Sequence, residues 1–491
     1  MGQPFYLALD QGGHATRAII FDAAGGALAR SSVVVSSQSP QPDMLEQDPE
    51  EVVASLGRAV AGVLRVLGAP AAQNIAAAGL ATQRASLVCW DSRTGRALSP
   101  ILSWQDRRAT SLLPAYKAHA FTIRDHTGLV LSPHYGALKM RWCLDHILAV
   151  RAAEKAGHLI IGPLASFLAF RLVVPQPLFV DPANAGRTLL WSRQRRDWDP
   201  ELLQIFGISE QILPNCVPSR YSFGGLRVGG AHVPLAVMTG DQAAALFSEG
   251  MPRPDTIYIN IGTGAFLQRP TAHAMVDPGP LLWSIAFQDD QESVSVVEGT
   301  VNGAGAALTW GSAALPYPDL ALHCDSLLAN ADPRPFFLNT VGGLGSPYWL
   351  PDVAPRFAGD GTIPAKAAAI IESVIFLINE NIDAIQVQTG PCAGLVLTGG
   401  MAEHDGICQA LANLSGLSVR RPGEPEGTAR GLAFLVAGTP GEWPKSSQEQ
   451  TFWPAENEGL SERFRCWHDL MAHLRSGEDE LAGIDAGDAS R

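Results

Sequence analysis

The segment FYLALDQGGHATRAIIFDAAGG, residues 5–26, decides the fold class. Its first apolar run ends at Asp10, a glycine turn follows, and a second apolar run covers residues 18–21. Another glycine turn and the β-branched run 33–35 come next. Apolar runs separated by short glycine-containing turns are typical of β-hairpins. The sequence therefore predicts two adjacent hairpins, and not a single strand that leads directly into a helix.

A helix is predicted directly after these hairpins. Asp48 is a preferred N-cap residue, Pro49 suits the first helical position, and Glu51 stands where a capping box places an acidic residue. Apolar residues then recur at helical spacing along one face, namely Val52, Leu56, Val60, Val63 and Leu67.

The hairpin pattern recurs in the second half of the chain. Residues 256–261 form a β-rich run, Gly262-Thr263-Gly264 is a turn, and the strand pattern resumes at 265–267. A long helical pattern covers 365–385, and the buried strand pattern of 395–398 runs into Gly399-Gly400. This is a weak internal duplication, so we expect an α/β chain made of two halves, each a hairpin sheet followed by helices.

The length and composition agree with two domains. The chain has 491 residues, of which 46% are hydrophobic and 17% charged, which fits a soluble globular protein and not a disordered one. Polar residues interrupt the apolar pattern near 245–255. We therefore expect an N-terminal domain at 1–246, a C-terminal domain at 247–439, and a polar extension at 440–491 whose last dozen residues are mobile.

Charge and cysteine content exclude several kinds of partner. The net charge of −13 disfavours nucleic acid, because phosphate backbones need a positive surface. No apolar stretch is long enough to span a membrane, and the N-terminus does not resemble a signal peptide. The seven cysteines form no CxxC pair, and the histidines form no HExxH motif. We expect a cytoplasmic protein, and the sequence leaves open whether it forms a homo-oligomer.

Four glycine turns are candidates for anion binding, because backbone N–H groups can approach an anion closely where there is no Cβ. They lie at 10–14, 262–264, 303–305 and 399–400. None fits the P-loop or the GxGxxG pattern. A plain hairpin is the commoner explanation for any one of them. Jointly they favour a site for Mg²⁺ and nucleotide phosphates, since Asp10 ends the first strand and Thr263 lies in the second turn.

Two further segments carry polar groups that chemistry could use. Asp241 follows an apolar run and precedes an alanine-rich stretch, so it either caps a helix or acts as a general base toward a hydroxyl. Arg84 and Trp104 offer a donor and an aromatic face of the kind that a polyol or sugar needs, although core packing is an equally common role for a tryptophan.

At this point the chain resembles the FGGY carbohydrate kinases, most closely the glycerol kinase branch, over residues 5–438. Ten segments match in order, and they are 9–12 with Arg17, 44–49, 82–84, 104–108, 197–199, 240–247, 262–264, 298–299, 343–349 and 399–400. The resemblance implies two actin-like (ribonuclease-H-like) domains around an ATP cleft. It also implies ATP and Mg²⁺ as cofactors and transfer of phosphate to a hydroxyl of a small sugar or polyol.

The resemblance also implies roles for particular residues. Asp241 would be the catalytic base, and Asp10 would hold the Mg²⁺. The substrate would be bound by Arg84, Ala85, Trp104, His134, Asp241 and Gln242. The ATP would be bound by Gly12, Gly13, His14, Arg17, Thr263, Gly305, Gly400 and His404.

Two departures from the family pattern concern the substrate. Ala85 stands where the glycerol kinase branch has an acidic residue, and His134 replaces a tyrosine. A site that loses a hydrogen-bonding partner for a hydroxyl loses discrimination sharply. These departures favour a longer sugar or polyol over glycerol. Two alternatives are a glycerol kinase proper and a catalytically weak regulator that binds sugar or nucleotide.

Overall fold

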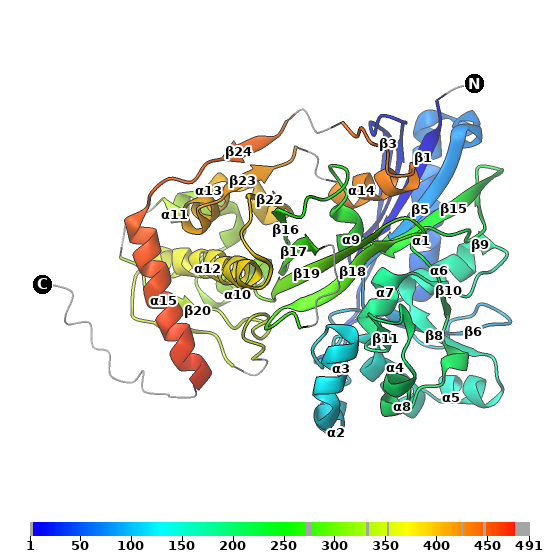
Figure 1. Ribbon diagram of the computed structural model, residues 1–491, viewed down its shortest axis with the longest axis horizontal. Helices are drawn as coiled ribbons and strands as arrows, with labels where there is room; N and C mark the ends of the chain where they lie inside the picture. The colour runs from blue at the N-terminus through cyan, green and yellow to red at the C-terminus, as the bar shows by residue number, and fades with distance from the viewer. Residues whose placement is uncertain are drawn as a thin grey trace, which may run out of the picture.

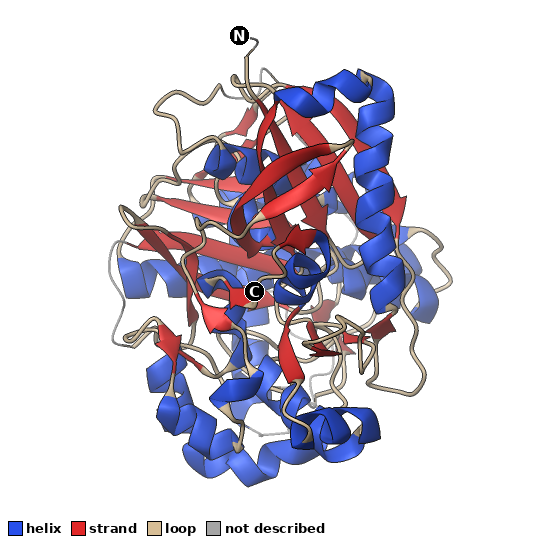
Figure 2. Ribbon diagram, turned by 90° about the vertical axis from the view of Figure 1, so that its right-hand side faces the viewer, coloured by secondary structure: helices blue, strands red, loops and turns tan. Residues whose placement is uncertain are grey.

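The computed structural model describes residues 3–271, 277–329, 333–350, 353–423, 426–444 and 448–476. Strands lie in the interior and helices pack around them (Figures 1 and 2). Within this described part of the chain, no helix is long and apolar enough to cross a membrane.

The first half is built on a sheet of seven strands. Their order is β3-β2-β1-β5-β15-β14-β9. The predicted hairpins are confirmed, since β1, β2 and β3 are consecutive antiparallel neighbours, and β5 and β15 then extend the sheet in parallel with β1. The strands of this sheet are β1 (Phe5–Gln11), β2 (Ala15–Phe21), β3 (Ala27–Val34), β5 (Ile75–Thr82), β9 (Val173–Val174), β14 (Gly225–Val228) and β15 (Ala231–Gly240).

The second half repeats this arrangement, which confirms the predicted duplication. Its sheet has the order β18-β19-β17-β16-β22-β23-β24. Here β16, β17 and β19 are antiparallel neighbours, and β22 and β23 run parallel to β16. The strands are β16 (Thr256–Ile261), β17 (Ala265–Thr271), β18 (Leu282–Gln288), β19 (Ser293–Val301), β22 (Gly394–Thr398), β23 (Ser418–Arg421) and β24 (Gln450–Phe452).

Smaller sheets stand beside these two. One has the order β4-β7-β6-β8, with β4 (Glu46–Gln47), β6 (Leu87–Asp91), β7 (Ile101–Leu102) and β8 (Leu159–Pro163). Three pairs of short strands are β10 (Phe179–Val180) with β13 (Asn215–Cys216), β11 (Trp191–Ser192) with β12 (Asp197–Trp198), and β20 (Phe336–Leu338) with β21 (Arg356–Ala358).

The helices of the first half surround its sheets. They are α1 (Pro49–Leu67), α2 (Leu113–Tyr116), α3 (Ala120–Thr127), α4 (Gly136–His146), α5 (Leu148–Lys155), α6 (Leu164–Leu172), α7 (Pro182–Ala185), α8 (Pro200–Phe206) and α9 (Asp241–Ala245). The start of α1 is as predicted, since the Asp48 side chain accepts hydrogen bonds from two backbone N–H groups. The capping box is not formed, because the Glu51 carboxylate accepts from Ser36 instead.

The helices after residue 247 are α10 (Gly305–Ala314), α11 (Cys324–Leu328), α12 (Ile363–Thr389), α13 (Asp405–Ser415), α14 (Gly427–Val436) and α15 (Glu458–Ser476). The helix predicted at 365–385 is α12. It is buried along most of its length in the core of the second half.

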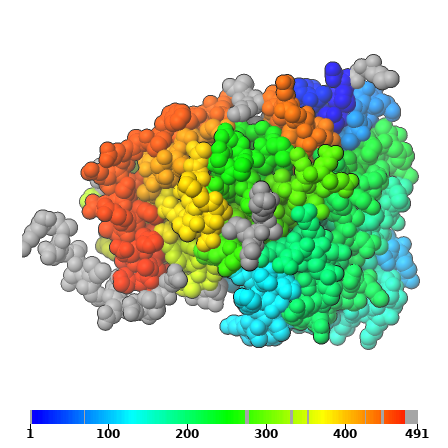
Figure 3. All heavy atoms as spheres, viewed as in Figure 1, coloured from blue at the N-terminus to red at the C-terminus, as the bar shows by residue number. Residues whose placement is uncertain are grey.

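Helix α14 does not follow the division of the chain that the sequence predicted. Although it lies between residues 247 and 439, it packs on the first sheet, where its Leu432 and Leu435 share a core with Ala8 and Phe247. Figure 3 shows this orange segment beside the blue N-terminal residues. The opposite face of the same sheet is covered by α1. The first sheet is therefore enclosed by helices from both ends of the chain.

The region after residue 439 is more than a polar extension. Strand β24 pairs with β23, and α15 places Trp467 and Met471, both fully buried, in the core of the second half. The sequence did not show this, because polar residues outnumber the apolar stripe of α15. The mobile tail predicted at residues 480–491 lies outside the described residues.

Candidate active site

Three parallel strands bring the predicted catalytic residues together. Strands β1, β5 and β15 are neighbours, and in their register Gln11 and Gly240 both pair with Thr82. The carboxyl ends of neighbouring parallel strands meet at one edge of the sheet, where α/β proteins bind ligands. Asp10, Arg84 and Asp241 therefore lie at this edge. The residues are 74 or more positions apart in sequence, and only the sheet joins them.

The two aspartates are close enough to influence one another. Burial raises the pKa of Asp10 to about 7, and the negative charge of Asp241 adds to the shift while Arg17 opposes it. Burial likewise raises the pKa of Asp241, against the positive charge of Arg84 and a hydrogen bond from the backbone N–H of Gln242. Two carboxylates that repel one another in a buried place are suited to share a cation or to hold a proton.

Asp241 does not act as the N-cap of its helix. Gly240 occupies the cap position, no side chain makes the capping hydrogen bond there, and Asp241 is the first residue of α9. Its carboxylate accepts a hydrogen bond from the N–H of the next residue, at 2.7 Å from Gln242 N, and among the described residues it does not reach the N–H groups further along the helix that an N-cap side chain would bond. The helix-cap explanation considered for Asp241 is thus not supported.

The predicted substrate residue Arg84 is held in an ion-pair network that reaches the second sheet. Its guanidinium donates to Glu298 Oε1 at 2.9 Å and also to Gln242. Glu298 belongs to β19, and Arg187 pairs with its other oxygen. Burial by itself would raise the pKa of Glu298, but the charges of Arg187 and Arg84 outweigh it and lower the pKa to about 2. The network therefore stays charged at neutral pH and joins the two halves.

Sequence reasoning assigned no role to Glu298 or Arg187. Glu298 lies within one of the segments that match the family, and a carboxylate directly after Val296 and Val297 in a strand is a signal that it needs a buried partner. Nothing in the local sequence identifies that partner, since Arg84 lies 214 residues away.

The predicted substrate residues Trp104, Ala85 and His134 come from loops beside the first sheet. All three are half-buried. The Trp104 ring meets Phe266 of β17 edge-on, with 6.2 Å between ring centroids, so the aromatic wall includes a residue of the second half that the sequence did not indicate. Ala85 has a φ of 61°, and its carbonyl accepts a hydrogen bond from the buried Lys139 at 3.2 Å.

The predicted phosphate turn of the first half is the β1–β2 turn. Gly12 N–H closes it by donating to Ala15 O at 3.0 Å, and Gly13 O accepts from Gln47. His14 is exposed at its tip. Arg17 lies opposite Asp10 across the hairpin, with 3.4 Å between its Nη1 and Asp10 Oδ2.

The predicted nucleotide residues of the second half lie around the end of β16. Gly305 N–H, at the start of α10, donates to Gly262 O at 3.0 Å, and a Cβ on Gly305 would lie 2.7 Å from that oxygen. Thr263 is in the same turn, and Gly400 follows β22, the parallel neighbour of β16. Thr263, Gly305 and Gly400 thus share one region. His404 lies beyond it and contacts Asp325 at 3.3 Å.

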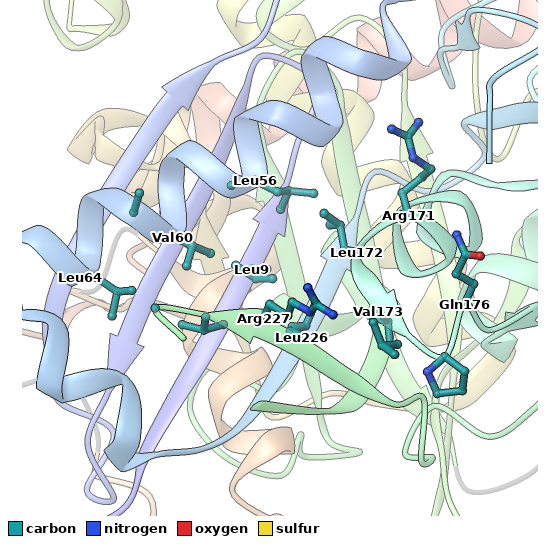
Figure 4. Close-up of a pocket in the computed structure, with 16 residues that line it drawn as sticks. Leu9, Leu56, Val60, Leu64, Arg171, Leu172, Val173, Gln176, Leu226 and Arg227 are labelled. Atoms are coloured by element: carbon teal, nitrogen blue, oxygen red, sulfur yellow. The ribbon is translucent and has the colours of Figure 1, made fainter. Parts of the chain in front are cut away.

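A separate cavity of about 880 Å³ lies between α1, β9 and β14 (Figure 4). Leu56, Val60 and Leu64 of α1 face Leu226 of β14 across it. Leu9 also lines this cavity, whereas Ala8, its neighbour in β1, faces α14 on the other side of the sheet. The described lining contains none of the residues predicted to bind substrate, ATP or Mg²⁺.

Comparisons with known proteins agree with the two-domain arrangement described above. Residues 5–248 match the N-terminal domain of the FGGY family of carbohydrate kinases, and residues 257–438 match its C-terminal domain. A glycerol kinase of Trichlorobacter lovleyi is 34% identical over 464 residues, which cover 92% of this chain and 93% of that protein.

Solved structures show the same fold. A Plasmodium falciparum glycerol kinase with ADP superposes with a TM-score of 0.83 at 20% identity, covering 96% of this chain and 98% of that one. A xylulose kinase from Rhodospirillum rubrum superposes with a TM-score of 0.83 at 19% identity, covering 96% and 99%. The actin-like two-domain fold expected from the sequence is confirmed.

Proposed function

Because the chain belongs to the FGGY family of carbohydrate kinases, and so transfers phosphate from ATP to a hydroxyl of a small sugar or polyol, we propose that Asp241 is the general base of this reaction. The observation that carries the proposal is the meeting of Asp10, Arg84 and Asp241 at the carboxyl ends of β1, β5 and β15. A base, a cationic donor and a second carboxylate at one edge are the groups that phosphoryl transfer needs.

The chemistry of Asp241 follows from its surroundings. An acceptor hydroxyl beside its carboxylate would give up its proton to Asp241 as the hydroxyl oxygen bonds to the γ-phosphorus. The bond from that phosphorus to the bridging oxygen breaks, and ADP leaves with the electron pair. Burial raises the pKa of Asp241, which makes its carboxylate a stronger proton acceptor than an exposed aspartate.

Asp10 fits a role in holding Mg²⁺. Asp10 is 4% exposed, its carboxylate lies at the sheet edge beside Asp241, and among the described residues Arg17, at 3.4 Å, is its one cationic neighbour. Mg²⁺ is commonly bound through one or two carboxylates with the remaining ligands from water and phosphate. When bound, the ion would neutralise charge on the phosphates. No group of three or more His, Cys, Asp or Glu side chains suited to a metal occurs within the described ranges.

The glycine turns would hold the nucleotide. In the first half, the turn that follows Asp10 offers the backbone N–H groups of Gly13 and His14, and the charged side chain of Arg17 lies beside it. On the second half, Thr263 lies in the turn after β16, Gly305 packs against that turn, and Gly400 has no described atom within 4 Å of where its Cβ would stand, so its backbone can approach a phosphate closely. We assign residues up to about 246 with α14 to the substrate and Mg²⁺ side, and the remainder to the nucleotide side.

The net charge and the free thiols indicate the kind of partner and the cellular compartment of the enzyme. A net charge of −13 disfavours nucleic acid, and all seven cysteines are free. Free thiols suit a reducing compartment, so we assign the kinase to the cytoplasm.

The test of Asp241 is the variant Asp241→Asn. The amide keeps the shape of the side chain and an oxygen for the Gln242 N–H, but it cannot take a proton. We expect acceptor-dependent ADP production to fall by about 10²- to 10⁴-fold, while ATP affinity, measured by calorimetry, changes little. Asp360→Asn, at an exposed surface aspartate, is the matched control and should retain full activity.

Two results would contradict this assignment. Turnover of Asp241→Asn within a few fold of the wild type would remove Asp241 as base. Tight binding of ATP by the wild-type protein, without ADP release for any sugar or polyol, would identify a regulator that binds nucleotide. A glycerol kinase proper is the second candidate, favoured by the identity to glycerol kinases, and efficient turnover of glycerol alone would establish it.

A further inference from the structure

Glu426 lies beside the proposed Mg²⁺ site, although no sequence motif indicated it. It directly precedes α14 and is half-buried. Its Oε2 lies 3.4 Å from Arg17 Nε, and Arg17 Nη1 lies 3.4 Å from Asp10 Oδ2. Burial is the largest cause of the raised pKa of Asp10, and the negative charges of Asp241 and Glu426 add to it. One guanidinium therefore stands between two carboxylates that come from opposite ends of the chain.

The start of α14 is anchored at the same edge of the sheet. Glu426 O accepts from Arg430 N–H at 3.0 Å, and Arg430 Nε donates to Ser248 O at 2.9 Å. Thr428 Oγ1 donates to Asp241 O at 3.3 Å, so this helix start also contacts the backbone of the proposed base. A side chain on a rigid element keeps its position better than one on a free loop. The backbone of Glu426 is therefore held where its carboxylate stays within reach of Arg17.

Arg17 is tightly bound to neither carboxylate. Both of its contacts measure 3.4 Å, whereas a direct charge-assisted hydrogen bond measures about 2.7–2.9 Å. Arg108, by comparison, lies 2.7 Å from Asp106 Oδ2. The Arg17 side chain is 37% exposed and that of Asp10 only 6%, so the arginine has room to move and the aspartate does not. A guanidinium and Mg²⁺ compete for the same Asp10 oxygens, because both are cations.

From this arrangement we propose that Glu426 is a positioning residue for Mg²⁺ binding, which holds the Arg17 guanidinium so that the Asp10 carboxylate is open to the ion. The proposal rests on the proposed kinase function and adds a residue to its metal site. Without Mg²⁺, Arg17 is shared between the two carboxylates. When Asp10 binds Mg²⁺, Arg17 keeps Glu426 as its partner. Without Glu426, Asp10 would be the one carboxylate left to Arg17 among the described residues, and the arginine would oppose the ion.

Binding of Mn²⁺ tests this without reference to turnover. Mn²⁺ prefers the same oxygen ligands as Mg²⁺, and electron paramagnetic resonance measures free Mn²⁺ while the protein is titrated in saturating ADP. The variant Glu426→Gln keeps the size of the side chain but loses its charge, and we expect the Kd for Mn²⁺ to rise by about 10-fold. Glu50→Gln is the matched control, since Glu50 on α1 pairs with Arg171 at 2.6 Å, and it should bind Mn²⁺ as the wild type does.

A double-variant cycle shows whether Glu426 acts through Arg17. In the background Arg17→Met the competing cation is gone, so Glu426→Gln should change the Kd for Mn²⁺ by less than about 2-fold. A loss of the same size in both backgrounds would mean that Glu426 acts on the ion directly, and it would overturn the proposal. A Kd for Glu426→Gln equal to that of the wild type would overturn it as well.

The dependence of turnover on Mg²⁺ separates this role from a merely structural one. With an accepted sugar or polyol, Glu426→Gln should raise the Mg²⁺ concentration for half-maximal ADP release by about 10-fold. Its kcat at saturating Mg²⁺ should stay within a few fold of the wild type, and its urea midpoint should match that of Glu50→Gln. A fall in kcat that excess Mg²⁺ does not restore would count against the proposal.

The failure of this inference can be told from failure of the proposed function. If the wild-type protein binds no Mn²⁺ and releases no ADP with any acceptor, the kinase function itself fails, and the role of Glu426 fails with it. If the wild type does both, and Glu426→Gln leaves Mn²⁺ binding unchanged, only the role of Glu426 is overturned.

Discussion

The ion pairs of Glu298 offer a sharp test of how the two halves are joined. Glu298 comes from the second sheet and accepts hydrogen bonds from Arg84 and Arg187 of the first half and from Gln268 of its own half. It is 3% exposed, and the two arginines are nearly as buried. The variant Glu298→Gln keeps the shape and the acceptor oxygen but removes the negative charge, so two buried guanidinium groups lose their counter-charge.

The expected cost can be worked from the pKa. A pKa of about 2, against the ordinary value of 4.5, corresponds to about 3 kcal/mol in favour of the charged carboxylate in the folded state. Breaking a buried ion pair typically costs about 3–5 kcal/mol, which agrees. Because the folded-state pKa is depressed, this stabilisation is present at neutral pH and above about 4.5, and it is lost as the pH falls through about 2.

The assay is the free energy of unfolding in urea at pH 7, together with KM for the acceptor. We expect Glu298→Gln to lose about 3 kcal/mol and to raise KM, since Arg84 would no longer be held at the sheet edge. The control is Asp255→Asn, which removes the partner of the exposed Arg253 at 2.7 Å and should cost less than about 1 kcal/mol. A cost for Glu298→Gln no larger than that of the control would refute the reasoning.

Three other predictions concern stability. Gly431→Ala would place a Cβ 1.9 Å from Ala244 O, between α14 and α9. The urea midpoint should therefore fall by the equivalent of about 2 kcal/mol or more. Gly57→Ala is the control and should be neutral or stabilising, because no described atom lies within 4 Å of the added Cβ. Burial lowers the pKa of Lys139 from 10.5 to about 7, so the folded protein binds fewer protons than the unfolded chain between these values. Its stability should rise there by up to about 1.4 kcal/mol per pH unit, and Lys139→Met should flatten the profile; an unchanged slope would count against a buried, shifted lysine. Asp48→Ala should lower the melting temperature through a loss of about 1 kcal/mol, and an unchanged melting temperature would show that the cap of α1 is dispensable.

Local patterns predicted the elements of this fold well. The hairpins of residues 5–34, the N-cap at Asp48 and the long helix α12 all follow from runs, turns and periodicity within a few residues of one another. Such local patterns do not predict the sheet on which a helix packs. Helix α14 reads as an apolar helix in any context, and only packing with Ala8 and Phe247 places it on the first sheet.

The sequence predicted candidate site residues at chain positions that the fold brings together, but not their contacts with one another. Asp10 lies near the end of β1 and Asp241 directly follows β15, and the sequence placed both at strand ends; their roles stay predictions. The partner of Arg84 could not be predicted, because Glu298 lies 214 residues away and the two meet only where the two halves contact one another. The partners of the buried Lys139 likewise depend on three-dimensional packing, since its ammonium group donates to the carbonyls of Ser103 and Ala85, which lie 36 and 54 residues away.

The central claim is phosphoryl transfer to an acceptor hydroxyl with Asp241 as base, and phosphorus NMR of the reaction mixture tests it most directly. For the wild-type protein with ATP, Mg²⁺ and an accepted sugar or polyol, the account predicts a new phosphate monoester and one ADP for each ester formed. Asp241→Asn should form neither at a comparable rate. Inorganic phosphate in place of the ester, or ester formation that persists in Asp241→Asn, would contradict the account.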